Sequence, residues 1–176
     1  MLQGLKKAVA IVLLISLVPL TAVVTAGVKQ RFGDGPQRFF SGGELIEGAL
    51  YQGEEPDWTL VDQVPTVELQ LIEPPQSRRI WAAQYEGKLY VWSGYMGTFV
   101  GRLWKQWPLQ AERDGRAVIR IDGIRYERYL KRIDSGDELD GIAAAVTAKY
   151  PSRMTRSAIE SGDVWLFRAD EPREGR

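Results

Sequence analysis

The sequence predicts an α+β, mainly β domain of about six antiparallel strands and two helices, preceded by one N-terminal transmembrane helix. Three observations predict this fold. Residues 8–28 form an apolar run without a charge. The pairs Glu86-Gly87 and Asp122-Gly123 each separate two runs of β-favouring residues, as hairpin turns do. Two further segments carry apolar residues at helical spacing.

The composition excludes several classes of site. The chain of 176 residues has 23 basic and 23 acidic residues, so its net charge gives no reason to expect a nucleic-acid partner. It contains no cysteine, which excludes disulfides, thiol catalysis and cysteine-type zinc sites. It contains no histidine, which excludes a Ser-His-Asp triad, histidine metal sites and axial-histidine haem. We therefore expect no metal site.

The apolar run at residues 8–28 follows Lys6 and Lys7 and has the length of a membrane span. At ~1.5 Å per residue it reaches about 31 Å, against a hydrocarbon core of ~30 Å. The alternative is a cleaved signal peptide, because Val24, Thr25 and Ala26 precede a plausible cleavage position. Apolar regions of signal peptides usually have only ~7–15 residues. We therefore expect an uncleaved single-pass anchor, with the N-terminus inside and the domain on the extracytoplasmic side.

Composition also suggests the domain limits. Residues 1–28 are the anchor, and residues 29–65 are a tether because glycine and proline interrupt them too often for long regular elements. Within the tether, Phe39, Phe40 and Trp58 are expected to dock on the domain or lie at the membrane interface. Residues 66–170 form the folded domain, and residues 171–176 form a charged tail.

Alternating apolar and polar residues indicate the strands of this domain. The predicted strands are residues 66–72, 80–85, 88–93, 118–121, 124–133 and 163–168. Both alternating sets of residues 88–93 are largely apolar, so we expect this strand to be covered on both faces. Asp122 and Gly123 tolerate positive φ and join residues 118–121 and 124–133 as a hairpin. A basic edge is expected from Arg125, Arg128, Lys131 and Arg132, either as a solvated face or as a surface attracted to anionic headgroups.

Two helices are predicted between the strands. Thr98 caps the first, which is expected to run to about Trp107 and to end at Pro108. Its predicted buried stripe is Val100, Leu103, Trp104 and Trp107. Ser135 and Glu138 have the spacing of a capping box for the second helix. The apolar residues of this helix are Leu139, Ile142, Ala143, Val146 and Tyr150, and Pro151 follows them.

The order of these elements resembles a known superfamily. The predicted order begins with two strands, followed by Ser93-Gly94, Gly97-Thr98 and a short helix. It continues with a strand, an Asp-Gly turn, a strand, a helix and a last strand. This pattern resembles the split β-barrel flavoproteins, which include pyridoxamine-phosphate oxidase-like proteins and deazaflavin (F420)-dependent reductases. The resemblance covers residues 66–169 and implies a split β-barrel.

The resemblance also implies a site for FMN or F420. Arg79 resembles the basic strand residue that holds the cofactor phosphate in the superfamily, and Trp92-Ser93 resembles the strand-end pair that reaches the flavin. Gly97-Thr98 resembles the turn that holds the phosphate again, and a helix N-terminus favours an anion there. Arg102 and Lys105 are the nearest later cations.

Two classes of function remain open after this comparison. In the first, the protein is a membrane-anchored oxidoreductase in which the flavin or deazaflavin supplies the hydride chemistry. In the second, the barrel has lost the cofactor and is a non-enzymatic binding or scaffold module at the membrane. Phe99 and Val100 follow Thr98 where the superfamily often has Arg-Lys, which favours the second class. Because split barrels often dimerise, the resemblance also implies a homodimer.

Overall fold

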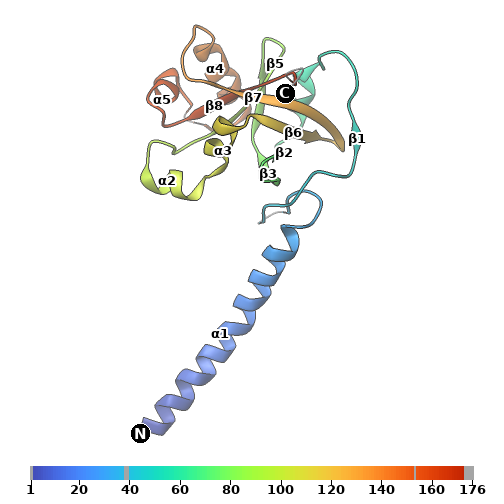
Figure 1. Cartoon of the computed structure of the whole chain (residues 1–176). Helices are drawn as coiled ribbons and strands as arrows, with labels where there is room; N and C mark the ends of the chain where they lie inside the picture. The colour runs from blue at the N-terminus through green and yellow to red at the C-terminus, as the bar shows by residue number, and fades with distance from the viewer. Residues whose placement is uncertain (1, 38–39, 153, 173–176) are drawn as a thin grey trace.

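One long helix extends away from a domain that is built on a curled sheet (Figure 1). The computed structural model describes residues 2–37, 40–152 and 154–172. Phe39, one of the expected docking residues, and residues 173–176 of the expected tail lie outside this described part of the chain.

Helix α1 (Leu2–Gln30) has the length and composition of a membrane span or of a signal sequence. The candidate span, Val9–Gln30, has 22 residues, and its most apolar window is not buried against the domain. Pro19 lies inside the helix, where it removes one backbone N–H donor. The Ser16 and Thr21 hydroxyls donate to carbonyl oxygens one turn earlier, at 2.9 Å and 2.8 Å. These bonds satisfy both hydroxyls without water, as an apolar environment requires.

The sheet closes on itself through one continuous segment of the chain. Its antiparallel strands follow the order β3-β2-β6-β7-β8-β5-β4. Their bounds are β2 Val67–Leu71, β3 Gln76–Ile80, β4 Ala82–Tyr85, β5 Lys88–Ser93, β6 Arg116–Ile121, β7 Ile124–Ile133 and β8 Trp165–Asp170. The two edge strands, β3 and β4, are separated in sequence only by Trp81. The sheet must therefore curl until both edges meet this segment, which makes it a half-barrel. Strand β1 (Ala49–Leu50) adds to β7 in parallel.

Both predicted hairpin turns are confirmed. Glu86 and Gly87 have φ of 50° and 68°, and Asp122 and Gly123 have φ of 47° and 79°. Two successive residues with positive φ match the right-handed twist of the flanking strands, which is why these pairs set the register locally. One further strand was not predicted: residues 76–80 form β3, which pairs with β2. Ile80, expected at the start of a strand over residues 80–85, belongs to β3 instead. The barrel therefore has one strand more than the sequence indicated.

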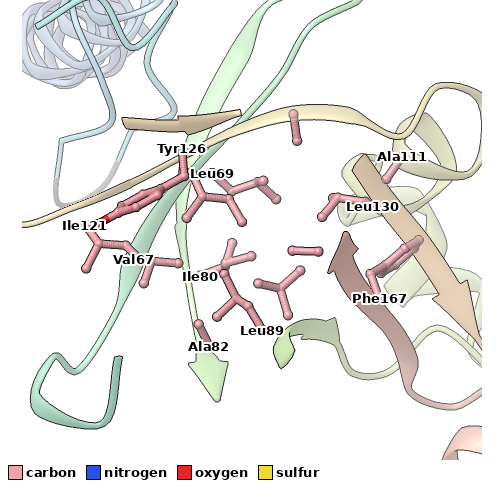
Figure 2. Packing of buried hydrophobic residues seen from close by; sticks show 14 of the residues in the cluster. Val67, Leu69, Ile80, Ala82, Leu89, Ala111, Ile121, Tyr126, Leu130 and Phe167 are labelled. Atoms are coloured by element: carbon pink, nitrogen blue, oxygen red, sulfur yellow. The ribbon is translucent and has the colours of Figure 1, made fainter. Parts of the chain in front are cut away.

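Two apolar clusters lie on opposite faces of the sheet. The first fills the half-barrel and includes Leu89 and Val91 of β5 (Figure 2). The second lies between the sheet and helices α4 (Leu139–Lys149) and α5 (Arg156–Glu160), and includes Tyr90 and Trp92 of β5. Strand β5 is therefore covered on both faces, as its two apolar sets predicted.

Part of the expected tether packs into the barrel core. A 3-10 helix, η1 (Trp58–Gln63), is capped by the Asp57 carboxylate, which accepts from the backbone N–H of Thr59 at 3.0 Å. Trp58 and Val61 of η1 are fully buried in the cluster that fills the half-barrel. Among the expected docking residues, Trp58 thus lies in the domain.

The predicted helix at residues 98–107 is wrong in extent and in its buried face. Thr98 does cap helix α2 (Phe99–Trp104), since its Oγ1 accepts from Gly101 N at 3.0 Å. A second helix, α3 (Trp107–Arg113), then begins with Pro108 in its first turn. Proline is favourable there because its missing N–H needs no partner. Of the predicted stripe only Trp107 is buried, whereas these residues are exposed: Val100, Leu103 and Trp104.

Helix α4 buries the predicted apolar face but does not use the predicted cap. Leu139, Ile142, Ala143 and Val146 are buried. Glu138 itself occupies the N-cap position without a side-chain bond, and the Ser135 hydroxyl donates to Asp134 Oδ1 at 3.1 Å. The capping box is therefore wrong. Helix α5 was not predicted, because the segment after Pro151 is polar and short.

Candidate functional site

The turn between β5 and α2 brings together several of the predicted site residues. Ser93 ends β5, and its buried Oγ has no hydrogen-bond partner within the described chain. The Thr98 hydroxyl donates to Tyr95 O at 3.0 Å in addition to its capping bond. Lys105 Nζ donates to Gly94 O at 3.0 Å, and burial lowers the pKa of this ammonium. The hydroxyl and the ammonium are therefore engaged within the turn itself.

Gly97 in the same turn lies against a carboxylate. A Cβ at this position would overlap Asp163 Oδ1, so only glycine allows the two segments to approach this closely. The backbone N–H of Met96 donates to Asp163 O at 2.8 Å, which fixes the contact. The nearest charge to Gly97 in this contact is therefore negative, which opposes the binding of an anion.

Arg79 belongs to a different neighbourhood. Its side chain is 52% exposed, and its Nε lies 3.9 Å from Glu68 Oε1. The other oxygen of Glu68 accepts from Arg120 Nε at 2.6 Å, and Arg120 also donates to Asp34 Oδ2 at 2.7 Å. Arg79 is thus the outer member of an ion network on β2, β3 and β6. Within the described residues it makes no hydrogen bond or ion pair with the β5–α2 turn.

Arg78 is the half-buried arginine of β3, and the sequence did not single it out. Burial and the positive charge of nearby Arg31 lower the pKa of its guanidinium to about 10. One of its terminal nitrogens donates to Gln76 Oε1 at 3.0 Å, and its Nε has no partner in the described part of the chain. Alternation in β3 could have distinguished it from Arg79, because Arg78 lies on the same side as buried Ile80.

Trp92 lies in an aromatic cluster with Trp81 and Tyr150. The ring centroid of Trp92 is 6.3 Å from that of Trp81 and 5.6 Å from that of Tyr150. Trp92 is buried, whereas Trp81 is 55% exposed and presents an aromatic surface to solvent. Trp107 of helix α3 does not belong to this cluster. Trp107 instead packs on Phe167 in the barrel core.

The end of helix α4 holds this aromatic cluster against the edge of the sheet. The carbonyl oxygen of Ala82 accepts from Lys149 Nζ at 2.8 Å and from the Tyr150 hydroxyl at 3.0 Å. Burial lowers the pKa of Lys149 and raises the pKa of Tyr150. In both cases burial favours the neutral form of the side chain over its charged form.

The residues at the β5–α2 turn do not fit a flavin phosphate. The Thr98 hydroxyl and Lys105 ammonium have internal partners, Asp163 adds a negative charge, and helix α2 has only 6 residues. Arg102 is exposed on α2, and its side chain makes no hydrogen bond or ion pair within the described residues. No group of three or more carboxylates among the described residues could hold a metal ion.

Several solved structures are similar in fold to this chain, and three of them are described below. No protein-family model matches the chain, and no curated protein matches it. The conserved hypothetical protein Rv2991 from Mycobacterium tuberculosis is 15% identical, with a TM-score of 0.49 over 70% of this chain and 82% of that one. A protein from Listeria innocua, provisionally named a pyridoxamine 5′-phosphate oxidase, is 10% identical, with a TM-score of 0.46 over 66% and 90%. A protein from Bacteroides thetaiotaomicron, provisionally named a 5-nitroimidazole antibiotic resistance protein, is 10% identical, with a TM-score of 0.47 over 80% and 93%.

The domain is a curled half-barrel of antiparallel strands. The similarity of the three solved structures to this domain is weak. At 10–15% identity they concern the fold alone, and with TM-scores below 0.5 they support no statement about activity or ligand.

Proposed function

We propose that this protein is a membrane-anchored split-barrel protein whose barrel is a non-enzymatic binding or scaffold module at the membrane surface. The observation that carries this proposal is the β5–α2 turn. There, two of the donors expected to hold a cofactor phosphate, the Thr98 hydroxyl and the Lys105 ammonium, are used within the chain, and the Asp163 carboxylate lies against Gly97. An anion would have to displace these bonds and approach a negative charge, which costs free energy.

Cofactor titration tests this proposal directly. Purified protein is expected to show no flavin or deazaflavin absorbance, and FMN, F420 and riboflavin are expected not to bind saturably when followed by fluorescence. Riboflavin lacks the phosphate, so it separates ring binding from phosphate binding. Saturable binding of FMN at micromolar concentration would contradict the proposal.

The exposed face of Trp81 favours one alternative, in which a flavin ring stacks on the aromatic cluster and the protein is an oxidoreductase. Two variants distinguish the sources of affinity. Trp81→Ala would weaken FMN and riboflavin alike. Arg79→Ala would weaken FMN by about tenfold or more and spare riboflavin, because a charge-assisted contact contributes ~1.5–3 kcal/mol. Arg116→Ala, which removes an exposed arginine at the start of β6, is the matched control.

Anchoring by α1 and the extracytoplasmic position of the domain are also part of the proposal. The full chain is expected to stay in the membrane fraction through a carbonate wash. N-terminal sequencing that finds a mature end at Gly27 would show a cleaved signal peptide instead. For orientation, a Lys88→Cys variant is expected to react with a membrane-impermeant maleimide on intact cells, since the natural chain has no cysteine.

A further inference from the structure

Helix α2 presents its apolar side chains to solvent and its smallest residue to the protein. The exposed apolar residues of the turn and helix, called here the α2 patch, are Tyr95, Phe99, Val100, Leu103 and Trp104. Each is at least 66% exposed, and Trp104 is 86% exposed. Gly101 is buried, and a Cβ there would overlap the carbonyl oxygen of Tyr95. Helix α2 thus packs on the domain through Gly101. Packing within the domain does not explain why the other positions carry large apolar side chains.

The backbone of the turn also holds Tyr95 outward. Tyr95 has a φ of 63°, a conformation that is uncommon and unfavourable for a bulky residue. Its ring is 74% exposed, with Lys105 Nζ 5.2 Å from the ring centroid. The strain is therefore not compensated by burial of the ring in the domain. A contact outside the domain would supply that burial.

The α2 patch lies at the end of the domain from which α1 leaves (Figure 1). The candidate membrane span of α1 ends at Gln30, so a membrane-spanning α1 places the start of the domain at the bilayer interface. Tyrosine and tryptophan favour that interface, because the ring is apolar and one end is polar. An apolar face of this kind enters the headgroup region when it lies in the plane of the membrane.

Cations surround this end of the domain. Arg102 and Lys105 lie on or beside α2, and Arg31 directly follows α1. The charge of Arg31 acts on half-buried Arg78, and neither guanidinium pairs with a carboxylate among the described residues. The Arg102 side chain makes no hydrogen bond or ion pair among the described residues, whereas Lys105 and Arg31 donate to the carbonyl oxygens of Gly94 and Pro75. Cations beside an apolar patch complement anionic headgroups.

We propose that the α2 patch docks into the headgroup region of an anionic bilayer, beside the point where α1 enters it. This inference rests on the proposed anchoring by α1. Docking would hold the half-barrel at one orientation to the membrane surface and leave the β4–β5 turn away from it, because β5 runs from that turn to α2.

Depth measurements on the full chain test this inference. The natural chain has no cysteine, so Val100→Cys and Lys88→Cys variants can each carry one NBD label. The labelled proteins are reconstituted into phosphatidylcholine vesicles with and without phosphatidylglycerol, and quenched by doxyl-labelled lipids or by iodide in water. We expect lipid quenching at position 100 to exceed that at position 88 several-fold, and to increase with phosphatidylglycerol. A Trp104→Glu change is expected to return the label at position 100 to water.

The outcomes separate docking from anchoring. A chain that resists carbonate extraction, with position 100 as accessible to iodide as position 88, would overturn docking and leave the anchor intact. Position 100 shielded from iodide but not reached by lipid quenchers, with disulfide cross-links between two copies of Val100→Cys, would overturn docking in favour of a homodimer. Extraction of the chain by carbonate would overturn both proposals.

Discussion

The guanidinium of Arg128 lies over the indole of Trp58, with its central carbon 4.7 Å from the ring centroid. The Glu55 carboxylate joins the two residues, because it accepts hydrogen bonds from Arg128 Nη1 and from Trp58 Nε1, each at 2.7 Å. Arg128 is only 6% exposed. The sequence placed it on an exposed basic edge, which is wrong, because the segment before β2 folds over this part of β7 and covers it.

Removing the Arg128 side chain is expected to destabilise the domain strongly. Arg128→Ala leaves Glu55 without its cation and opens space beside Trp58, and loss of one partner of a buried ion pair costs ~3–5 kcal/mol. Arg116→Ala removes an arginine whose side chain is 57% exposed, and is expected to change the unfolding free energy little. Urea unfolding in mild detergent, followed by tryptophan fluorescence, measures both. Equal effects of the two substitutions would show that the Arg128 pair is not buried in solution.

Two tryptophans close in sequence are expected to differ greatly in their contribution to stability. Trp107 packs on Phe167 and is buried, so Trp107→Ala should cost ~3–5 kcal/mol. Trp104 is 86% exposed, so Trp104→Ala should change the unfolding free energy by less than ~1 kcal/mol. The same urea titration compares them. A large loss for Trp104→Ala in detergent would mean that another surface covers α2 even without a bilayer.

The folded unit is expected to begin before residue 66. A fragment of residues 66–172 lacks Trp58 and Val61, which are fully buried in the barrel. Loss of a buried aromatic alone costs ~3–5 kcal/mol, against a typical total of ~5–15 kcal/mol. We expect residues 29–172 to unfold cooperatively and residues 66–172 to lack a cooperative transition, as measured by circular dichroism during heating. Similar thermal unfolding transitions for both fragments would instead support a domain that begins at residue 66, as composition predicts.

Stability is expected to fall in acid, partly through Asp34. Burial acts most strongly and would raise the pKa of this carboxyl, but hydrogen bonds from backbone N–H groups and from Arg120 together lower it below 3.8. Because the pKa is lower in the folded state, the carboxylate stabilises the fold above about pH 4, and this is lost as the pH falls toward the folded value.

Asp34→Asn keeps an oxygen for the backbone donors and removes the charge. The variant should be less stable than wild type at neutral pH and lose less stability between about pH 5 and pH 3. Urea unfolding at several pH values measures this, and parallel curves for the two proteins would exclude Asp34 as a contributor.

Gly97 is expected to be needed for packing rather than for a ligand. Gly97→Ala places a methyl group on Asp163 Oδ1 and should cost ~1–3 kcal/mol. Shortening the opposing side chain with Asp163→Gly should recover part of this loss in the double variant, which a double-mutant cycle measures. No recovery would mean that the backbone of the turn, and not the carboxylate, excludes a side chain.

The sequence alone determined the features that depend on neighbouring residues. Glu86-Gly87 and Asp122-Gly123 formed the expected turns because positive φ is a local property of these residue types. The length of α1 and the two-sided burial of β5 also followed from local composition and alternation. For the candidate site, Ser93, Gly97, Thr98 and Lys105 lie together because they are close in sequence. Arg79 does not join them, because its ion pair is with Glu68 of strand β2.

Tertiary structure decided which surfaces are covered. Sequence spacing placed the apolar residues of α2 on one face, but only the position of Gly101 against the turn determined that this face points outward. Likewise, Arg128 is buried only because Trp58 and Glu55 return from an earlier segment to cover it. Trp81 and Tyr150 meet because the chain crosses from one edge of the curled sheet to the other at Trp81. Burial depends on contacts between segments distant in sequence, and no local pattern contains that information.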